Sequence, residues 1–450
     1  MRPRPSQVMV LVGIALFGAP VALAQVAPGH SGHRQAAMST APRDLELAGP
    51  LDRVTVERLA VARNPGLRAA RRRASATRLA GEAEGKLPPP EAEFQIWQVP
   101  LSRPYDVPGA QMIMLGLRQP IPAPGSLGAK AQAKERDADL ELAMADERAR
   151  EIVRDVDHAF VSYVEATRKH RIHAQHQAVA EAILRTAQAR YPAGGALTDI
   201  TQAEVEVAKI EADVAVEEAN VSTARATLNG LLLRSADAPL GQPMEHEAVT
   251  VGESPADILA RARALRPETR TAKARAAAAV AEAHVAETEA NGPMMSVGLL
   301  YFAPTTQVPS HGYGLSFSST LPWLWGKARG AVRAQRELAR ATTDDAADAE
   351  ARIATEIASA EGQVRAQARR LVTLERRSLP AAKRAFEAAT SGYTSGGTDI
   401  LVLLSARNSV VTTEVEIVGA KAALAHALVE LDWAAGSPVR RIPLQGTESP

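Results

Sequence analysis

The sequence predicts a mainly α-helical protein with a small β part, built from two copies of one unit that each hold long coiled-coil helices and two strands. Aromatic residues make up only 4% of the 450 residues, and long stretches consist of alanine, glutamate, arginine, leucine and valine. This composition is typical of long helices. The same landmarks occur twice at a nearly constant spacing, and short runs of alternating apolar and polar residues lie ahead of the longest helical stretches.

The repeat is clearest at two glycine turns. The stretch YPAGGALTDI begins at Tyr191, and YTSGGTDI begins 202 residues later at Tyr393. Pro65 and Pro267 have the same spacing. A period this long excludes a solenoid of short repeats and indicates a tandem duplication.

The N-terminus has the pattern of an export signal. Arg2 and Arg4 precede an apolar run at 8–17, which is followed by the small-residue site Ala22-Leu23-Ala24. This pattern predicts a secretory signal peptide cleaved after Ala24. No later segment approaches the roughly 20 apolar residues of a membrane helix, which leaves the periplasm, the cell exterior or a β-barrel membrane as the destination.

The rest of the chain divides around the two repeats. In chain order we expect a signal peptide at 1–24, a loose segment at 25–50, a first repeat at 51–233, a linker at 234–253, a second repeat at 254–436 and a loose C-terminal tail at 437–450. Each repeat should contain a helix, two strands, a long helix and a returning helix. The long helices, at 126–190 and 327–391, would each be about 100 Å long, so they should form a coiled coil or the wall of a tube.

The expected strands imply an oligomer. They lie at 93–101, 111–119, 295–303 and 313–321, and the last alternates apolar and polar residues as a strand between lipid or core and water would. Four strands cannot close a barrel, and lipid does not tolerate an open sheet edge. Three copies would supply twelve strands, within the range of outer-membrane barrels. The nearby aromatic residues fit either an interfacial girdle or ordinary packing: Trp97, Trp323, Trp325, Tyr301 and Tyr313.

The two returning helices differ in their apolar seam. From Ile200 to Leu231 the seam keeps heptad spacing, which is typical of knobs-into-holes packing. The second copy places Arg407, Glu414 and Lys421 on the equivalent seam. We therefore expect looser or solvent-facing packing there.

The glycine turns are the best candidate functional site. Glycine can reverse a helix because it takes positive φ freely, and Thr198 or Thr398 could cap the next helix, with the nearby aspartate in its first turn. Simple capping is one interpretation. The other is that Asp199 and Asp399 narrow the mouth of a tunnel, with six carboxylates in a trimer. The candidate residues for tip and gate are Tyr191, Gly194, Gly195, Thr198, Asp199, Tyr393, Gly396, Gly397, Thr398 and Asp399.

Histidines form a second candidate. His170, His173 and His176 are three residues apart, so they spread over roughly 120° of one helix face. With His30 and His33 they suggest weak contact with a transition metal. A solvated polar face is the competing interpretation, since no acidic or cysteine ligand completes the set in sequence.

Several functions are excluded or disfavoured. A net charge of +1 argues against a nucleic-acid binder, and the absence of cysteine removes disulfides and thiolate sites. No zinc-protease, phosphate-loop or Gly-x-Ser-x-Gly motif is present, and GHSGH at 29–33 has the wrong spacing. We expect no enzyme activity and no cofactor.

At this point the residues resemble a known family. RNPGLRAAR after VTVERLAVA is similar to that family's opening, LRQPIP and STLPW to its junctions between strand and long helix, and the two stretches from Tyr191 and Tyr393 to its hairpin tips and returning helices. The family is the TolC outer membrane factors, and the resemblance covers about residues 51–436. Two features depart from it: there is no cysteine for an N-terminal lipid anchor, and Val402 stands where some relatives have a second aspartate.

The resemblance implies a homotrimer in the outer membrane of a Gram-negative cell, with a 12-stranded barrel in lipid and a long α-helical tunnel in the periplasm. It also implies docking to a periplasmic adaptor and to an inner-membrane pump, expected to be proton-driven, which makes the chain a passive exit duct of a tripartite efflux system. Metal ions and organic compounds both stay open as cargo. The alternative is a periplasmic coiled-coil adaptor or scaffold, although such proteins have one long hairpin rather than two. An exported enzyme is a more distant alternative.

Overall fold

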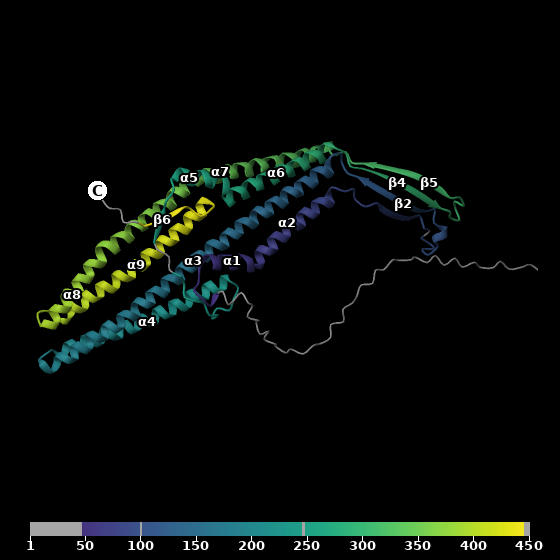
Figure 1. The fold of residues 1–450 in the computed structure, drawn as a ribbon. Helices are drawn as coiled ribbons and strands as arrows, with labels where there is room; N and C mark the ends of the chain where they lie inside the picture. Colours follow the sequence, from purple (N-terminus) through teal and green to yellow (C-terminus); the bar gives the residue numbers. More distant parts are fainter. Residues whose placement is uncertain (1–46, 100, 245–247, 445–450) are drawn as a thin grey trace, which may run out of the picture. The chain divides into compact units, whose positions relative to one another are not determined.

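The computed structural model describes residues 47–99, 101–244 and 248–444. The predicted signal peptide, His30 and His33 lie outside the described residues. Two similar halves follow each other (Figure 1). The first half contains α1 (Arg53–Arg63), α2 (Pro65–Glu84), β1 (Glu91–Trp97), β2 (Met112–Ile121), α3 (Ser126–Arg190) and α4 (Leu197–Leu231). The second contains α5 (Pro255–Leu265), α6 (Pro267–Asn291), β4 (Met295–Ala303), β5 (Gly312–Ser319), α7 (Lys327–Thr373), α8 (Leu379–Ser395) and α9 (Ile400–Ala435).

The fold class predicted from sequence is confirmed for the single chain. The first long helix, α3, has the predicted bounds and 65 residues. The second is longer than predicted at its end and is interrupted by a π-helical segment, Leu374–Ser378, between α7 and α8. Pro380 follows within the first turn of α8. Because proline lacks an N–H group, it disturbs the preceding helical hydrogen bonds, and a π-bulge absorbs that disturbance.

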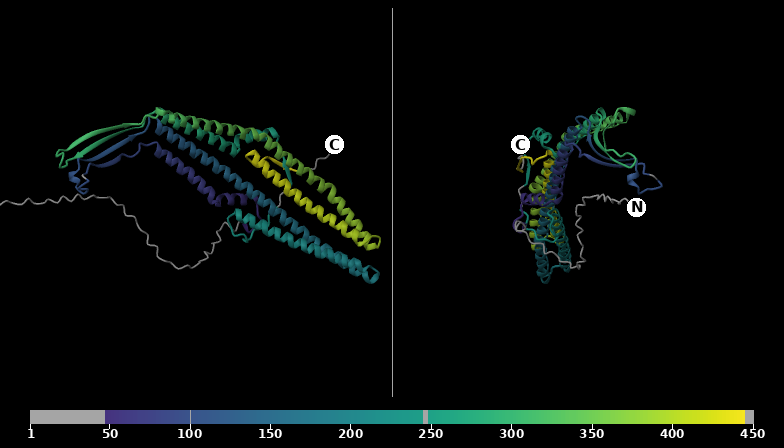
Figure 2. Two further views of the ribbon diagram at one scale, coloured as in Figure 1. Left: turned by 180° about the vertical axis from the view of Figure 1, so that it is seen from behind. Right: turned by 90° about the vertical axis from the view of Figure 1, so that its right-hand side faces the viewer.

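The four principal strands form one antiparallel sheet in the order β1-β2-β4-β5 (Figure 2). The two hairpins, one from each half, join through β2 and β4, with Leu117 opposite Leu299. The outer edges of β1 and β5 pair with no other strand of the described chain.

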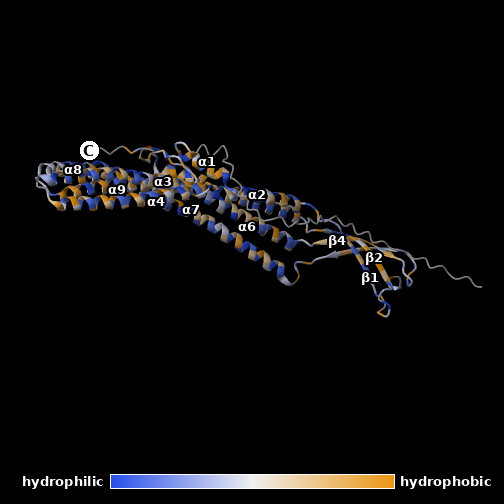
Figure 3. Cartoon of the chain, turned by 90° about the horizontal axis from the view of Figure 1, so that it is seen from below, coloured by the Kyte–Doolittle hydropathy of each residue, from blue (hydrophilic) through white to orange (hydrophobic). Residues whose placement is uncertain are grey.

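Hydrophobic and hydrophilic residues alternate along the strands (Figure 3), so the two faces of the sheet differ in chemistry. The register sets apolar residues side by side across all four strands, as in the row Phe94, Leu115, Tyr301 and Tyr313. Most of these side chains are exposed, up to 86% for Tyr313. The other face carries polar pairs, including a hydrogen bond between the Ser296 and Ser318 hydroxyls. Such alternation is typical of a sheet between lipid and water.

The helices extend from one end of the sheet and pack side by side in a layer, called the helical wall below (Figure 1). Next to the strands, α2 packs on α3, α3 on α6, and α6 on α7. Farther along, α3 packs on α4 and α9, and α9 packs on α7 and α8. The helices thus lie side by side in one layer, and α3 and α9 are its interior members. Among the described helices, none is long and apolar enough to cross a membrane.

A two-stranded sheet holds the ends of the second half together. β3 (Val249–Val251) pairs with β6 (Arg441–Pro443). The expectation of a loose tail is therefore wrong for its described part: Val439 is buried and donates its N–H to the Asp432 side chain. The backbone is ordered here because its polar groups bond to the linker strand.

Candidate functional site

The two hairpin turns are built on left-handed glycines. Gly194 has φ +96° and Gly396 has φ +81°, a region that other residues rarely adopt. Gly195 is required for a different reason: a Cβ there would lie 2.9 Å from the Arg190 carbonyl oxygen. The sequence-based expectation that glycines reverse the chain at these points is therefore in agreement with the backbone.

One tyrosine connects the two turns. Tyr393, at the end of α8, is buried and donates its hydroxyl to Asp199 Oδ2 at 2.9 Å. The Arg190 guanidinium lies 4.4 Å from the Tyr393 ring centroid and donates to the Tyr393 carbonyl. Burial, followed by the bond to Asp199, raises the pKa of Tyr393. The two hairpins are thus tied by two hydrogen bonds and one cation–π contact.

An apolar cluster surrounds this tie. It contains residues from all four helices of the two hairpins: Ile183, Ala187, Ala203, Ala389, Tyr393, Ile400, Leu403 and Leu404. Tyr191, by contrast, is exposed. The sequence pattern did not indicate which of the two tyrosines, Tyr191 or Tyr393, would connect the turns.

The prediction that Thr198 and Thr398 cap the returning helices is wrong. Ala196 is the N-cap of α4, so Thr198 lies inside the first turn and Asp199 at its third position. Asp399 is itself the N-cap of α9 and accepts a hydrogen bond from the Leu401 N–H at 2.9 Å. The second turn is two residues shorter, which moves the aspartate from the first turn to the cap.

The charged seam of α9 contradicts its expected solvent exposure. Arg407 is only 2% exposed and pairs with Glu206 of α4 at 2.6 Å. Glu414 contacts His176 at 2.8 Å and Lys383 at 3.4 Å. Lys421 pairs with Glu375 at 2.7 Å. These charges face other helices that supply their counter-charges, so α9 is well packed.

The predicted histidine stripe is partly shielded from water. The three histidines are half-buried, and the Nδ1 atoms of His173 and His176 have no hydrogen-bond partner. His176 has an acidic neighbour, Glu414, that the sequence did not place. In the described part of the chain, no group of three histidine or acidic side chains is arranged to hold a metal ion. Metal contact by His170, His173 and His176 stays a prediction.

A second polar cluster, which sequence reasoning missed, joins α3 to α9. His158 Nδ1 lies 2.7 Å from His426 Nδ1, and His158 Nε2 lies 2.6 Å from Glu430. Burial, followed by the neighbouring His158, lowers the pKa of His426. Next to His158, burial raises the pKa of Asp157 to about 8, although Arg53 opposes the shift.

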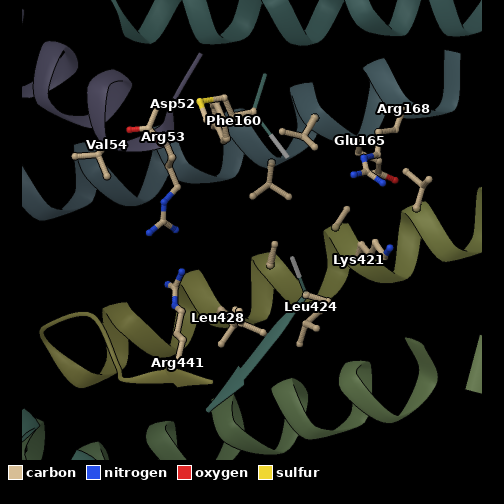
Figure 4. A pocket seen from close by; sticks show the side chains of 18 residues that line it. Asp52, Arg53, Val54, Phe160, Glu165, Arg168, Lys421, Leu424, Leu428 and Arg441 are labelled. Atoms are coloured by element: carbon tan, nitrogen blue, oxygen red, sulfur yellow. The ribbon is translucent and has the colours of Figure 1, made fainter. Parts of the chain in front are cut away.

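A cavity of about 430 Å³ lies between α1, α3, α9 and β3 (Figure 4). Its walls are largely apolar, with Phe160, Leu424 and Leu428 among them. Arg53, Lys421 and Arg441 also line it, and each pairs with a carboxylate: Asp157, Glu375 and Asp432 respectively.

The comparisons with known proteins bear on both the second half and the whole fold. Residues 258–437 match the family model described as outer membrane efflux protein. Among curated proteins none matches the chain.

Several solved structures share the fold. VceC from Vibrio cholerae is 17% identical, with a TM-score of 0.70 over 86% of this chain and 96% of that one. CusC is 15% identical, with a TM-score of 0.72 over 87% and 94% of the two chains. The open state of MtrE from Neisseria gonorrhoeae is 19% identical, with a TM-score of 0.66 over 87% and 91%.

Proposed function

Because the chain belongs to the TolC family of outer membrane efflux proteins, we propose that it is the passive exit duct of a tripartite efflux system. Three copies would close a 12-stranded barrel in the outer membrane, and their helices would form a tunnel in the periplasm. A periplasmic adaptor and an inner-membrane pump would deliver the cargo, and the pump would supply the energy.

The four-stranded sheet carries this proposal. Its apolar face is exposed over all four strands, with Leu299 at 57%, Leu315 at 81% and Phe317 at 69%. In water that surface would be costly, while lipid would cover it favourably. The opposite face carries polar pairs at its helix-side end, with Arg118 paired to Glu91 at 2.5 Å, as suits the inside of a channel.

The unpaired edges of β1 and β5 support closure by identical copies. An open edge would leave backbone N–H and C=O groups without partners in lipid. In a closed ring of three chains, β5 of one copy would pair with β1 of the next. The aromatic side chains beside the strands, such as Tyr313 and Trp325, are 86% and 96% exposed, and they suit the girdle interpretation better than internal packing.

We assign the closing device of the duct to the hairpin turns. The bond from Tyr393 to Asp199 ties the two hairpins of one copy, and Asp399 stays exposed at the end of the chain's helical part. Releasing that tie would let the hairpins move apart and widen the mouth. The same turns are the expected docking surface for an adaptor.

Reconstitution tests the channel function. Protein extracted from outer membranes should migrate as a heat-labile trimer in dodecyl sulfate and should conduct ions in planar bilayers. Tyr393→Phe, which removes only the hydroxyl, should increase the open probability, whereas Tyr191→Phe at the exposed tip should not. A water-soluble monomer without conductance would refute the duct and would favour the alternative, a periplasmic scaffold.

A further inference from the structure

The chain has two free lateral edges, one at each side of its helical wall. The first consists of α2 followed by β1, and the second of β5 followed by α7. α2 packs on α3 with Leu67, Ala74 and Gly81 buried. α7 packs on α6. In the half of α7 nearer the strands, its buried residues include Ala339 and Ala346.

The free face of α2 is basic. Arg72 lies two residues before the buried Ala74, so it points about 160° away from the contact with α3. The same face carries Leu79, which is 63% exposed, and small residues at Ala76 and Ala83. Arg72 is exposed and makes no ion pair within the described chain.

The free face of α7 carries two aspartates, between Arg340 and Arg352. Asp344 and Asp348 lie two residues before and after the buried Ala346, so both point about 160° away from α6. Both are exposed. Asp348 contacts Arg352 on its own helix at 3.2 Å, and Asp344 has no ion pair in the described part of the chain.

The two charged faces lie at a similar level of the wall. A Cβ on Gly81 would lie 3.0 Å from the Lys134 Cβ, which aligns α2 with α3. Ala133 packs with Val285 and Ala281, which aligns α3 with α6. Lys273 pairs with Glu350 at 3.2 Å, which aligns α6 with α7. These three contacts together place Arg72 at about the height of Glu350 in α7. Asp344 and Asp348 both lie within about two helical turns of that height.

We propose that Arg72 of one copy pairs with Asp344 and Asp348 of the next, so that an arginine on one edge meets two aspartates on the other around the ring. This inference rests on the proposed trimeric duct and specifies which helices join and in what register. The contact is heterologous, because each copy offers one edge of each kind, and a threefold rotation between neighbouring copies would close it into a ring of three. The same arrangement puts β5 of one copy beside β1 of its neighbour, so helices and strands require the same order. Opposite charges also disfavour the like-edge pairings α2–α2 and α7–α7.

Cross-linking tests the register directly, because the natural sequence has no cysteine. The double variants Arg72→Cys with Asp344→Cys, and Arg72→Cys with Asp348→Cys, should give covalent trimers in dodecyl sulfate after treatment with a short bifunctional maleimide. The matched control combines Arg72→Cys with Arg369→Cys, which lies on the same face of α7 but about 37 Å along from Asp344. That control should stay uncross-linked.

Charge exchange tests the attraction itself. Arg72→Asp should lower the fraction of trimer that survives mild heating in detergent, as should Asp344→Arg with Asp348→Arg, and the combined variant should recover at least half of the loss. Trimers that conduct but cross-link only in the control register, or that show no recovery, would overturn this inference and leave the duct standing. If no trimer forms in any variant or in the natural protein, the duct and this inference both fail.

Discussion

Removing Glu206 tests whether the charged seam of α9 is a buried ion-pair layer. Arg407 is 2% exposed, its Nη1 atom contacts Glu206 at 2.6 Å and Asn408 Oδ1 at 3.0 Å, and its Nη2 atom donates to the His176 carbonyl at 3.1 Å. Glu206→Ala would leave the guanidinium buried with neutral acceptors only. Burial lowers the pKa of Arg407 despite the neighbouring carboxylate, which indicates that this charge is costly to desolvate.

The expected cost follows from that burial. Breaking a buried pair by removing one partner typically costs 3–5 kcal/mol. Glu206 keeps 13% of its side chain exposed, so water can enter and we expect about 3 kcal/mol for Glu206→Ala. Adding Arg407→Met removes the unpaired charge and replaces it with an apolar side chain of similar length. The double variant should therefore cost less than about 1.5 kcal/mol.

Native-state hydrogen exchange of α9 is the suitable assay, because it reports local opening without requiring reversible unfolding of a membrane trimer. A loss of about 3 kcal/mol corresponds to exchange roughly a hundredfold faster near Leu403 and Val410. Amides in α6, far from the pair, serve as the internal control. The reasoning is refuted if the double variant exchanges faster than Glu206→Ala, or if Glu206→Ala changes exchange less than fivefold.

Three further predictions concern titration and the sheet. The pKa of Asp157 is raised to about 8, so the folded state favours the neutral carboxyl group. The free energy of unfolding of the natural protein should therefore fall as pH rises from about 4 to 8. Asp157→Asn should raise the melting temperature at pH 8 and leave it unchanged at pH 4. The pKa of His426 lies below its usual 6.5, so protonation of this side chain opposes folding. The free energy of unfolding should therefore fall as pH drops below 6.5. When melting temperatures are measured over a series of pH values, His426→Asn should show a smaller decrease at low pH than the natural protein. Leu315→Arg, on the apolar sheet face, should cost about 2–4 kcal/mol in lipid and reduce the trimer recovered from outer membranes. Ser316→Arg, one residue on and on the polar face, is its control, and equal loss for both would contradict the assigned faces.

The long helices and strands could be predicted from sequence because their signals are local. The stretch from Ser126 to Arg190 holds no proline or paired glycine, and α3 has those bounds. Alternation likewise located β5, because strand residues on one face share one environment. The π-helical segment at Leu374–Ser378 has only the nearby proline as a local signal, and it packs against α9, which is distant in sequence.

The candidate site could be predicted only in part, because its contacts join distant segments. The glycine turns were visible, but the tie between Asp199 and Tyr393 spans 194 residues. Arg190 was not singled out, although the repeat offered a signal: its counterpart 202 residues on is Gly392, so the arginine is specific to the first half. Threonine capping failed because the two-residue difference between the turns decides which residue begins the helix.

The contrast between α4 and α9 follows from their places in the wall. α3 and α8 flank α9, so its seam is interior and its charges must find partners such as Glu206. α4 lies at a free side of the single chain, where Val205 and Val216 are 68% and 58% exposed. Duplication produced two similar hairpins, but their returning helices have different surroundings. α9 lies between other helices of the same chain, whereas α4 lies at one side of the helical layer. The second copy could therefore accept charged seam residues once α3 and α4 supplied their partners, while the apolar surface of α4 requires cover from beyond its own chain.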